Sequence, residues 1–286
     1  MEKKIAFIGG DTRNALLAEI FAKEEWDVKC FGFEEYLFQN ENIQKLENLD
    51  GILENIEIVF SSVPFSKDGK TINTSFSKKE ILIKEVFEKM KKGTFFAGVL
   101  KEEWEREYKD IEFVDLMKDE VLTIQNAIPT AEGAIQKIIE KTNHTIYNSK
   151  ILISGFGRIG KILANRLQTF GAEIFCIARK KEDLTWIKAY GYNAILIEDL
   201  KNTSLEKFQI IINTIPCLIF EKEEVEKLNP ECFVIDLASK PGGFNRKEIE
   251  EKQISFEWAQ GIPGIVAPLT SAKFLKEAFE RYNKKK

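Results

Sequence analysis

Residues 150–258 alternate between short apolar runs and stretches that favour helix, and this alternation restricts the fold more than any other feature of the sequence. The runs are rich in Ile and Val, which is typical of strands buried on both faces of a sheet. Strands that alternate with helices form right-handed βαβ units and therefore a parallel sheet. The predicted strands cover 150–154, 172–178, 194–197, 208–214, 232–238 and 254–258, and the predicted helices cover 158–170, 181–190 and 220–228.

The N-terminal half repeats this alternation less regularly. Its predicted strands cover 4–8, 27–31, 57–61, 94–100 and 111–114, and its predicted helices cover 14–25 and 78–91. These elements favour a second, smaller α/β sheet, although the two halves are not a clean sequence repeat. We therefore expect an α/β protein of two domains: an N-terminal flavodoxin- or Rossmann-like parallel sheet and a C-terminal Rossmann domain, with a cleft between them.

The polar, turn-rich segment 142–149 follows a predicted helix over 131–141 and indicates where the two domains are joined. We expect the final helix, over 271–282, to pack back on the N-terminal domain. The expected parts are an N-terminal α/β domain (1–128), a linking helix and linker (129–148), the Rossmann domain (149–268) and a C-terminal helix and tail (269–286).

Composition and charge argue against several classes of function. The chain has 286 residues and a formal net charge of −4, whereas a nucleic-acid binder usually has a basic excess. No apolar run approaches the roughly 18 residues of a membrane span. The four cysteines form no CxxC pair and His144 is the single histidine, which disfavours a metal centre and a disulfide framework. We expect a protein of a reducing compartment without a metal, a nucleic-acid partner or a membrane span.

A glycine-rich segment follows the strand predicted over 150–154 and opens the next helix. It reads Gly155-Phe156-Gly157-Arg158-Ile159-Gly160, the GxGxxG pattern of dinucleotide-binding Rossmann domains. The first glycine allows the tight turn, the second lets a pyrophosphate approach the backbone, and the third lets helix and strand pack closely. The N–H groups at the start of the helix attract phosphate. All six residues are therefore candidate cofactor contacts.

The end of the next predicted strand favours NADP over NAD. Enzymes that use NAD usually have an acidic residue there, which binds the ribose 2′-hydroxyl. Here the strand runs into Arg179 and Lys180. A carboxylate would repel a 2′-phosphate, whereas a guanidinium can bind it with two hydrogen bonds. NADP is the predicted cofactor, and NAD stays open.

Ligands of such sheets bind beyond the carboxyl ends of the strands, so the segments after two later strands should border the nicotinamide. Thr214, Ile215 and Pro216 follow one strand, and Ala238 follows another. Segment 261–268 follows the last strand and is too rich in turn residues to be an ordinary helix. These residues favour an oxidoreductase that binds a nicotinamide cofactor in its C-terminal half.

Five further motifs occur in order along the chain. They are Gly9-Gly10-Asp11-x-Arg13, Asn126-x-Ile-Pro129-Thr130-x-Glu132-Gly133, Asn213-Thr-Ile-Pro216, Asp236-Leu-Ala-Ser-x-Pro-Gly-Gly243 and Gly261-x-Pro-Gly-Ile-Val-Ala-Pro268. Together with the glycine pattern, they resemble the dipicolinate synthase A-subunit family of spore-forming bacteria over essentially the whole chain. This combination of motifs is far more specific than GxGxxG alone.

The resemblance implies a reaction and a setting. A dihydrodipicolinate-type product of the lysine pathway would be oxidised to the aromatic pyridine-2,6-dicarboxylate (dipicolinate), with a hydride passing to NAD(P). It also implies that the partner is the flavin-binding B-subunit of dipicolinate synthase, and that the protein acts in spore formation, in the cytoplasm of the mother cell. The residues themselves leave open the stoichiometry, homo-oligomerisation and the hydroxylation state of the substrate.

A dicarboxylate substrate needs cationic or N–H groups that face the nicotinamide from the N-terminal domain. Arg13 suits bidentate binding of one carboxylate. Thr130, Glu132 and Gly133 are predicted at the start of the linking helix, where free N–H groups would hold the other. Lys240 is the candidate catalytic residue, either to move a proton or to bind a carboxylate. The candidate substrate contacts are Arg13, Ser62, Asn126, Thr130, Glu132, Gly133, Ser239 and Lys240.

Two other functions stay open. Another two-domain dehydrogenase, acting on 2-hydroxy acids or amino acids, would typically use a catalytic histidine or a paired lysine and histidine. His144 lies in the linker, away from any strand end, which argues against a catalytic histidine. A regulatory protein that senses nucleotides without chemistry would have the same Rossmann site. Turnover by the isolated chain distinguishes these alternatives.

Overall fold

The computed structural model describes residues 3–284, which form two compact units. Unit 1 holds the residues up to Asn126 and those from Ala267 onward, and unit 2 holds Ala127–Val266. The chain therefore leaves unit 1 inside a helix and returns to it after Val266. The linking segment expected over 129–148 belongs to unit 2.

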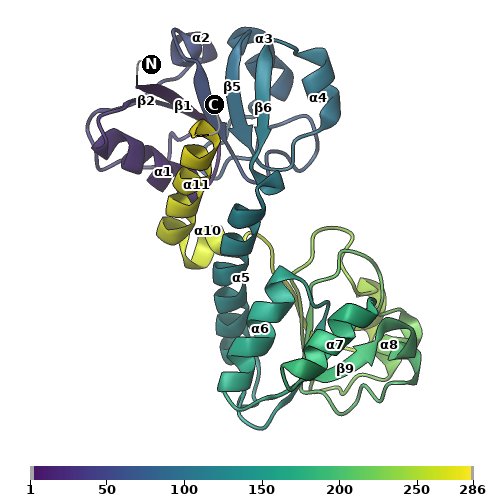
Figure 1. The fold of residues 1–286 in the computed structure, drawn as a ribbon. Helices are drawn as coiled ribbons and strands as arrows, with labels where there is room; N and C mark the ends of the chain where they lie inside the picture. The colour runs from purple at the N-terminus through teal and green to yellow at the C-terminus, as the bar shows by residue number, and fades with distance from the viewer. Residues whose placement is uncertain (1–2, 285–286) are drawn as a thin grey trace. The chain divides into compact units, whose positions relative to one another are not determined.

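Unit 1 contains a six-stranded parallel sheet in the order β3-β2-β1-β4-β5-β6 (Figure 1). Its strands are β1 (Lys4–Ile8), β2 (Asp27–Phe31), β3 (Ile43–Lys45), β4 (Ile58–Ser61), β5 (Gly93–Ala97) and β6 (Ile111–Asp115). Its helices are α1 (Thr12–Lys23), α2 (Leu49–Leu53), α3 (Ile83–Met90), α4 (Glu102–Glu107), the 3₁₀ turn η1 (Leu116–Lys118), the first part of α5 (Glu120–Lys141) and α11 (Pro268–Asn283).

Unit 2 contains a second six-stranded parallel sheet, in the order β12-β11-β10-β7-β8-β9. Its strands are β7 (Lys150–Ser154), β8 (Glu173–Ala178), β9 (Asn193–Leu196), β10 (Ile210–Asn213), β11 (Phe233–Asp236) and β12 (Ser255–Trp258). Its helices are the rest of α5, α6 (Arg158–Thr169), α7 (Lys181–Ala189), the 3₁₀ segment η2 (Ile197–Asn202), α8 (Lys222–Glu226), α9 (Arg246–Glu251) and α10 (Ile262–Val266).

The two sheets have the same topology. In each, the first strand is central, the next two strands lie on one side of it and the last three on the other. This is the strand order of dinucleotide-binding Rossmann sheets, and it reverses direction between β1 and β4 and between β7 and β10. The predicted α/β fold with two parallel sheets is confirmed, but the N-terminal sheet is not the smaller one. Strand β3 was not predicted, because Ile43 is the one buried residue in it and a single apolar residue gives no strand pattern.

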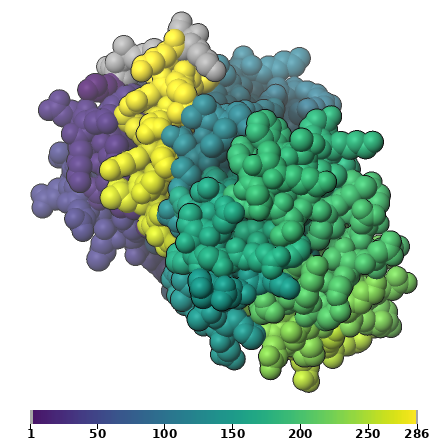
Figure 2. All heavy atoms as spheres, turned by 60° about the horizontal axis from the view of Figure 1, so that its bottom comes forward, coloured from purple at the N-terminus to yellow at the C-terminus, as the bar shows by residue number. Residues whose placement is uncertain are grey.

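The core of unit 1 is strongly aromatic. Phe60 stacks on Phe96 with ring centroids 4.7 Å apart, and Phe279 of α11 packs edge-on against these rings at 5.8 and 5.4 Å. Leu275 and Phe279 of α11 are buried in the same cluster as Phe21 of α1. Figure 1 and Figure 2 both show α11 (yellow) lying along the N-terminal segment (purple). The prediction that the final helix packs back on the N-terminal domain is confirmed.

Helix α5 is longer than expected. It begins at Glu120 instead of residue 131 and runs through Pro129. Asp119 caps its start through hydrogen bonds with N–H groups of the first turn. The predicted start was placed after Pro129 because a proline removes one helical hydrogen bond and usually ends or begins a helix. The prediction was wrong because Ala127 and Ala131, on either side of the proline, are buried, and this packing keeps the chain helical.

Two other segments differ from the prediction. The helix expected over 78–91 begins only at Ile83, because the preceding residues pair with residues 70–72. The N–H of Ile72 donates to the carbonyl of Ile81 at 2.9 Å, and the N–H of Ile83 donates to that of Lys70 at 3.0 Å. Segment 261–268 contains the short helix α10, where turns were expected. Among residues 3–284, no helix is long and apolar enough to cross a membrane.

Candidate functional site

The carboxyl edge of the sheet in unit 2 holds the glycine loop between β7 and α6. Gly155 has a φ of +95°, and a Cβ there would lie 2.4 Å from Thr214 Oγ1. A Cβ on Gly160 would lie 2.1 Å from the carbonyl oxygen of Gly155. Both positions therefore require glycine, the first for the turn and the second for the close packing of α6 on the loop.

Gly157 differs from both. It is the N-cap of α6. Among residues 3–284, no side chain caps this end of the helix, and a Cβ on Gly157 would meet no atom within 4 Å. A pyrophosphate needs free N–H groups, a partial positive charge and a close approach to the backbone, and an uncapped helix start beside an open glycine offers all three. The residues present therefore fit the phosphates of a dinucleotide.

The other residues of the loop divide into buried and exposed side chains. Phe156 is 5% exposed, its ring lies 6.3 Å from the ring of Tyr190, and Lys161 Nζ lies 5.5 Å from its centroid. Its side chain anchors the loop, so only its backbone is available to a ligand. Arg158 is exposed and Ile159 is half-buried at the start of α6.

Arg179 and Lys180 directly follow β8, and both are exposed. Because β8 pairs with β7, they lie at the same edge of the sheet as the glycine loop. Lys180 is the N-cap of α7, whose first turn holds Glu182 and Asp183. The strand end itself therefore presents cations, and the acids come after it on the helix.

The segment after β10 is tied to the end of β7. Thr214 donates to the carbonyl of Ser154 from its N–H at 2.9 Å and from its Oγ1 at 2.7 Å. Ile215 is half-buried and Pro216 is exposed. The backbone of this segment is therefore fixed beside the glycine loop.

The segment after β11 presents two polar side chains. Ser239 and Lys240 are exposed, whereas Ala238 is buried. The carbonyl of Ala238 accepts hydrogen bonds from Trp258 Nε1 at 2.8 Å and Gln260 Nε2 at 3.0 Å. The structure thus brings the candidate residues of unit 2 that follow β7, β8, β10 and β11 to one edge of the sheet.

Asn213 and Asp236, the polar residues that end β10 and β11, open two of the sequence motifs but were not among the candidate site residues. They are 0% and 1% exposed, and Asn213 Nδ2 donates to Asp236 Oδ1 at 2.8 Å. The available signal was a polar side chain at the end of each otherwise apolar strand.

The corresponding edge of unit 1 is closed. A glycine turn follows β1 as the glycine loop follows β7, but its backbone is already bonded to a neighbouring segment. The N–H of Gly10 donates to the carbonyl of Asn73, and the N–H of Ser75 donates to that of Gly10, both at 2.9 Å. The carboxylate of Asp11 caps α1. An anion at the start of a helix would repel phosphate, so this edge does not fit a second dinucleotide.

Arg13 and Ser62 both lie at this edge of unit 1, after β1 and β4. Arg13 is 5% exposed, and its Nε and Nη2 bind the Asp11 carboxylate, with Nη2 lying 2.7 Å from Oδ2. Nη2 also donates to the carbonyl of Val63, and Ser62 Oγ donates to that of Phe65 at 2.9 Å. Arg13 therefore already holds one carboxylate, and its Nη1 makes no hydrogen bond within residues 3–284.

The four candidates on α5 are Asn126, Thr130, Glu132 and Gly133. All four lie inside the helix, although Thr130, Glu132 and Gly133 were predicted at its start. The free N–H groups predicted there are therefore absent, because such groups occur in the first turn of a helix. A Cβ on Gly133 would lie 2.2 Å from Ile262 Cγ2, so this glycine allows α5 and α10 to cross closely. Glu132 Oε1 accepts a hydrogen bond from Arg166 Nη1 at 2.8 Å. Packing within unit 2 explains both residues.

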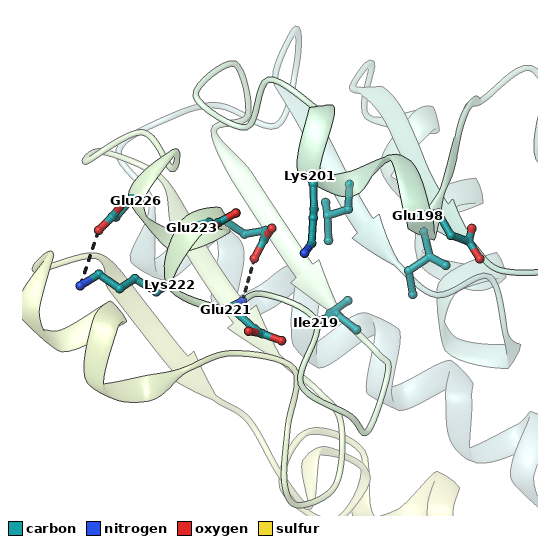
Figure 3. Close-up of a pocket in the computed structure, with 10 residues that line it drawn as sticks. Glu198, Lys201, Ile219, Glu221, Lys222, Glu223 and Glu226 are labelled. Carbon is teal, nitrogen blue, oxygen red and sulfur yellow. Dashed lines mark hydrogen bonds and ion pairs between the residues drawn. The ribbon is translucent and has the colours of Figure 1, made fainter.

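A pocket of about 540 Å³ lies between η2 and α8 (Figure 3). Its lining includes Ile219, Lys201 and five glutamates, among them Glu224. Glu224 Oε2 accepts from the N–H of Glu221 at 3.1 Å, and Oε1 has no hydrogen-bond partner in the described part of the chain. This excess of carboxylates would repel a pyrophosphate, so we do not assign the cofactor to this pocket. Within the described part of the chain, no group of His, Cys, Asp or Glu side chains is arranged to hold a metal ion.

Two family models match the chain, one in each half. Residues 4–117 match the N-terminal domain of the dipicolinate synthase A-subunit. Residues 122–239 match the NAD-binding domain of D-isomer-specific 2-hydroxyacid dehydrogenases, and this range includes the glycine loop. Residues 122–239 are therefore a nicotinamide-binding domain of the dehydrogenase type.

Relatives match along the whole chain. The dipicolinate synthase A-subunit of Bacillus subtilis (strain 168) is 29% identical, over 97% of this chain and 95% of its own length. A crystal structure of the dipicolinate synthase A-subunit from Bacillus halodurans superposes with a TM-score of 0.89 at 26% identity, over 99% of this chain and 98% of its own. A crystal structure of the dipicolinate synthase A chain from Bacillus subtilis superposes with a TM-score of 0.86 at 28% identity, over 100% of this chain and 97% of its own length. The resemblance in the motifs is confirmed: the chain is similar to dipicolinate synthase A-subunits over essentially its whole length.

Proposed function

We propose that the chain oxidises a dihydrodipicolinate-type intermediate of the lysine pathway to pyridine-2,6-dicarboxylate, with NADP as the hydride acceptor. The observation that carries this proposal is the glycine loop before α6, where the start of the helix has no side-chain cap and is open to a pyrophosphate. The loop occurs in a chain that is similar to the dipicolinate synthase A-subunit over its whole length. The flavin-binding B-subunit of dipicolinate synthase would be its partner. NADP is proposed over NAD because the two residues directly after β8 are Arg179 and Lys180, where an enzyme that uses NAD usually has an acid.

The protein's part of this chemistry is binding and proton transfer. Aromatisation removes a hydride from one ring carbon and a proton from another ring atom, and a nicotinamide cofactor, when bound, would supply the hydride acceptor. The start of α6 beside Gly157 would hold the pyrophosphate, and the segments after β10 and β11 would border the nicotinamide. Lys240, exposed on the second of these segments, would take the proton or hold a carboxylate.

Arg13 remains the proposed carboxylate binder of unit 1. Its ion pair with Asp11 fixes the plane of the guanidinium and leaves Nη1 for the substrate. Ser62 is a poorer candidate because its hydroxyl hydrogen is already donated to the carbonyl of Phe65. A substrate carboxylate accepts hydrogen bonds and cannot donate to the remaining lone pairs of Ser62.

Turnover by the purified chain tests the reaction. With the dihydro intermediate and NADP, we expect reduced nicotinamide and pyridine-2,6-dicarboxylate to form in equal amounts, measured by their separate absorbance bands. The assay is run with the chain alone and with the flavin-binding partner. Cofactor binding without product in both cases would favour a protein that only senses nucleotides, and turnover of a 2-hydroxy acid instead would favour a different dehydrogenase.

Cofactor choice is tested at Arg179. We expect the chain to bind NADP more tightly than NAD, and Arg179→Asp to reverse this order by weakening NADP binding about tenfold or more, because a carboxylate repels the 2′-phosphate. Calorimetric titration with both cofactors measures the change. Lys188→Asp makes the same change of charge in the last turn of α7 and should leave the preference unchanged. Equal affinities of the unmodified chain for the two cofactors would contradict the assignment.

A further inference from the structure

Two buried polar residues end neighbouring strands at the carboxyl edge of unit 2. Asn213 ends β10 and Asp236 ends β11, and the parallel register places them opposite each other. They are 0% and 1% exposed. Burying a carboxylate costs free energy unless its oxygens accept hydrogen bonds. The groups that donate to Asp236 therefore indicate which part of the chain it stabilises.

Asp236 organises the loop that follows β11. Its Oδ1 accepts from the N–H of Ala238 at 3.0 Å, and its Oδ2 accepts from the N–H of Gly243 at 2.7 Å. The carboxylate therefore closes residues 238–243 onto the end of their own strand. Gly242 has a φ of +84°, and a Cβ there would lie 2.8 Å from Asp236 Oδ2, so the loop can approach the carboxylate only with glycine at this position.

Asn213 organises the loop that follows β10. Its Oδ1 accepts from the N–H of Ile215 at 3.1 Å, and its Nδ2 donates to the carbonyl of the same residue at 3.0 Å. The bond from Nδ2 to Asp236 Oδ1 at 2.8 Å joins this loop to the loop after β11. A Cβ on Gly243 would lie 2.3 Å from Asn213 Nδ2, which shows how closely the second loop covers the amide.

We propose that Asn213 and Asp236 are positioning residues that set loops 214–216 and 238–243 against the glycine loop, so that Thr214 meets the nicotinamide half of the cofactor. The inference rests on the proposed function in one respect, the binding of a nicotinamide cofactor at this edge. Both side chains are buried beneath the loops and act through them. The arrangement is specific to a carboxylate, because both oxygens of Asp236 accept hydrogen bonds. An amide in its place would point its own N–H groups at one of the groups that donate to Asp236.

Hydrogen exchange tests directly whether Asp236 holds its loop. Asp236→Asn keeps the shape of the side chain but sets two donors against each other. We therefore expect the exchange of the Ala238 or Gly243 amide to become at least about tenfold faster. If Asp236→Asn does not fold, Asn213→Ala removes the bridge and should release the N–H of Ile215 in the same way. Unchanged exchange at these amides in a folded variant would overturn the proposal.

Cofactor affinity tests the consequence for binding. We expect Asp236→Asn to weaken NADP binding about tenfold, which corresponds to one lost hydrogen bond. Ser149→Ala is the matched control, because it removes the hydrogen bond from the buried Ser149 to the carbonyl of Thr145 at the opposite, amino edge of the same sheet. It should lower the Tm while leaving affinity unchanged.

The outcomes separate this inference from the proposed function. Equal losses of NADP affinity in Asp236→Asn and Ser149→Ala would show that Asn213 and Asp236 contribute only to general stability, and would overturn their positioning role. Failure of the unmodified chain to bind NADP or NAD would instead count against the proposed function. The exchange measurement needs no cofactor, so it would still decide whether Asn213 and Asp236 hold the two loops.

Discussion

Gly157→Ala is expected to abolish tight binding of the nicotinamide cofactor while leaving the fold intact. The fold tolerates the methyl group because it would meet no atom of residues 3–284 within 4 Å and because a φ of −83° suits alanine. Pyrophosphate binding does not tolerate the methyl group, since this group would fill the space through which a phosphate approaches the N–H groups of α6. Losing two charge-assisted hydrogen bonds of about 1.5 kcal/mol each weakens binding roughly a hundredfold.

Gly160→Ala is the matched contrast to this variant. Its Cβ would lie 2.1 Å from the carbonyl oxygen of Gly155, a backbone atom that cannot rotate away. We therefore expect a lower Tm, with cofactor binding lost together with the local structure. Thermal unfolding and calorimetric titration of both variants separate the two glycines. A Gly157→Ala variant with unchanged affinity would place the cofactor away from the start of α6.

The regular part of unit 2 could be predicted because strands buried on both faces must be continuous apolar runs. Each strand predicted there overlaps an observed one, and the glycine loop stands between β7 and α6 as expected. The start of α5 could not be predicted, because Pro129 is a strong local signal that buried packing on either side overrides. Local patterns are reliable only where tertiary contacts agree with them.

The site could be predicted where residue type determines backbone geometry, as at Gly155 and Gly160, and not where side chains meet across the fold. The bond between Asn213 and Asp236 joins residues that become neighbours only because β10 and β11 are adjacent in the sheet. The position of Arg13 after a glycine turn could be read from the sequence. Its ion pair with Asp11 could not, because that contact depends on the rotamers of both side chains.

Arg13→Ala is expected to lower the stability of unit 1. The variant loses the ion pair with Asp11 and leaves the carbonyl of Val63 without this donor. One buried, charge-assisted contact contributes about 1.5–3 kcal/mol, so the Tm should fall measurably. Asp11 itself is less affected, because its side chain is 30% exposed and still accepts the backbone N–H at position 13.

Turnover should fall in Arg13→Ala for a separate reason, the loss of the Nη1 contact with a substrate carboxylate. At a temperature well below the Tm, we expect kcat/KM to fall roughly 10- to 150-fold with NADP affinity unchanged, and Arg13→Lys to recover only part of it. Ser61→Ala is the control: it removes the bond from Ser61 Oγ to the carbonyl of Ile8 at 2.6 Å in the same unit, and should lower the Tm without changing turnover. A folded Arg13→Ala variant with full turnover would limit Arg13 to its ion pair with Asp11. A loss of NADP affinity by the same factor would instead place Arg13 on the cofactor.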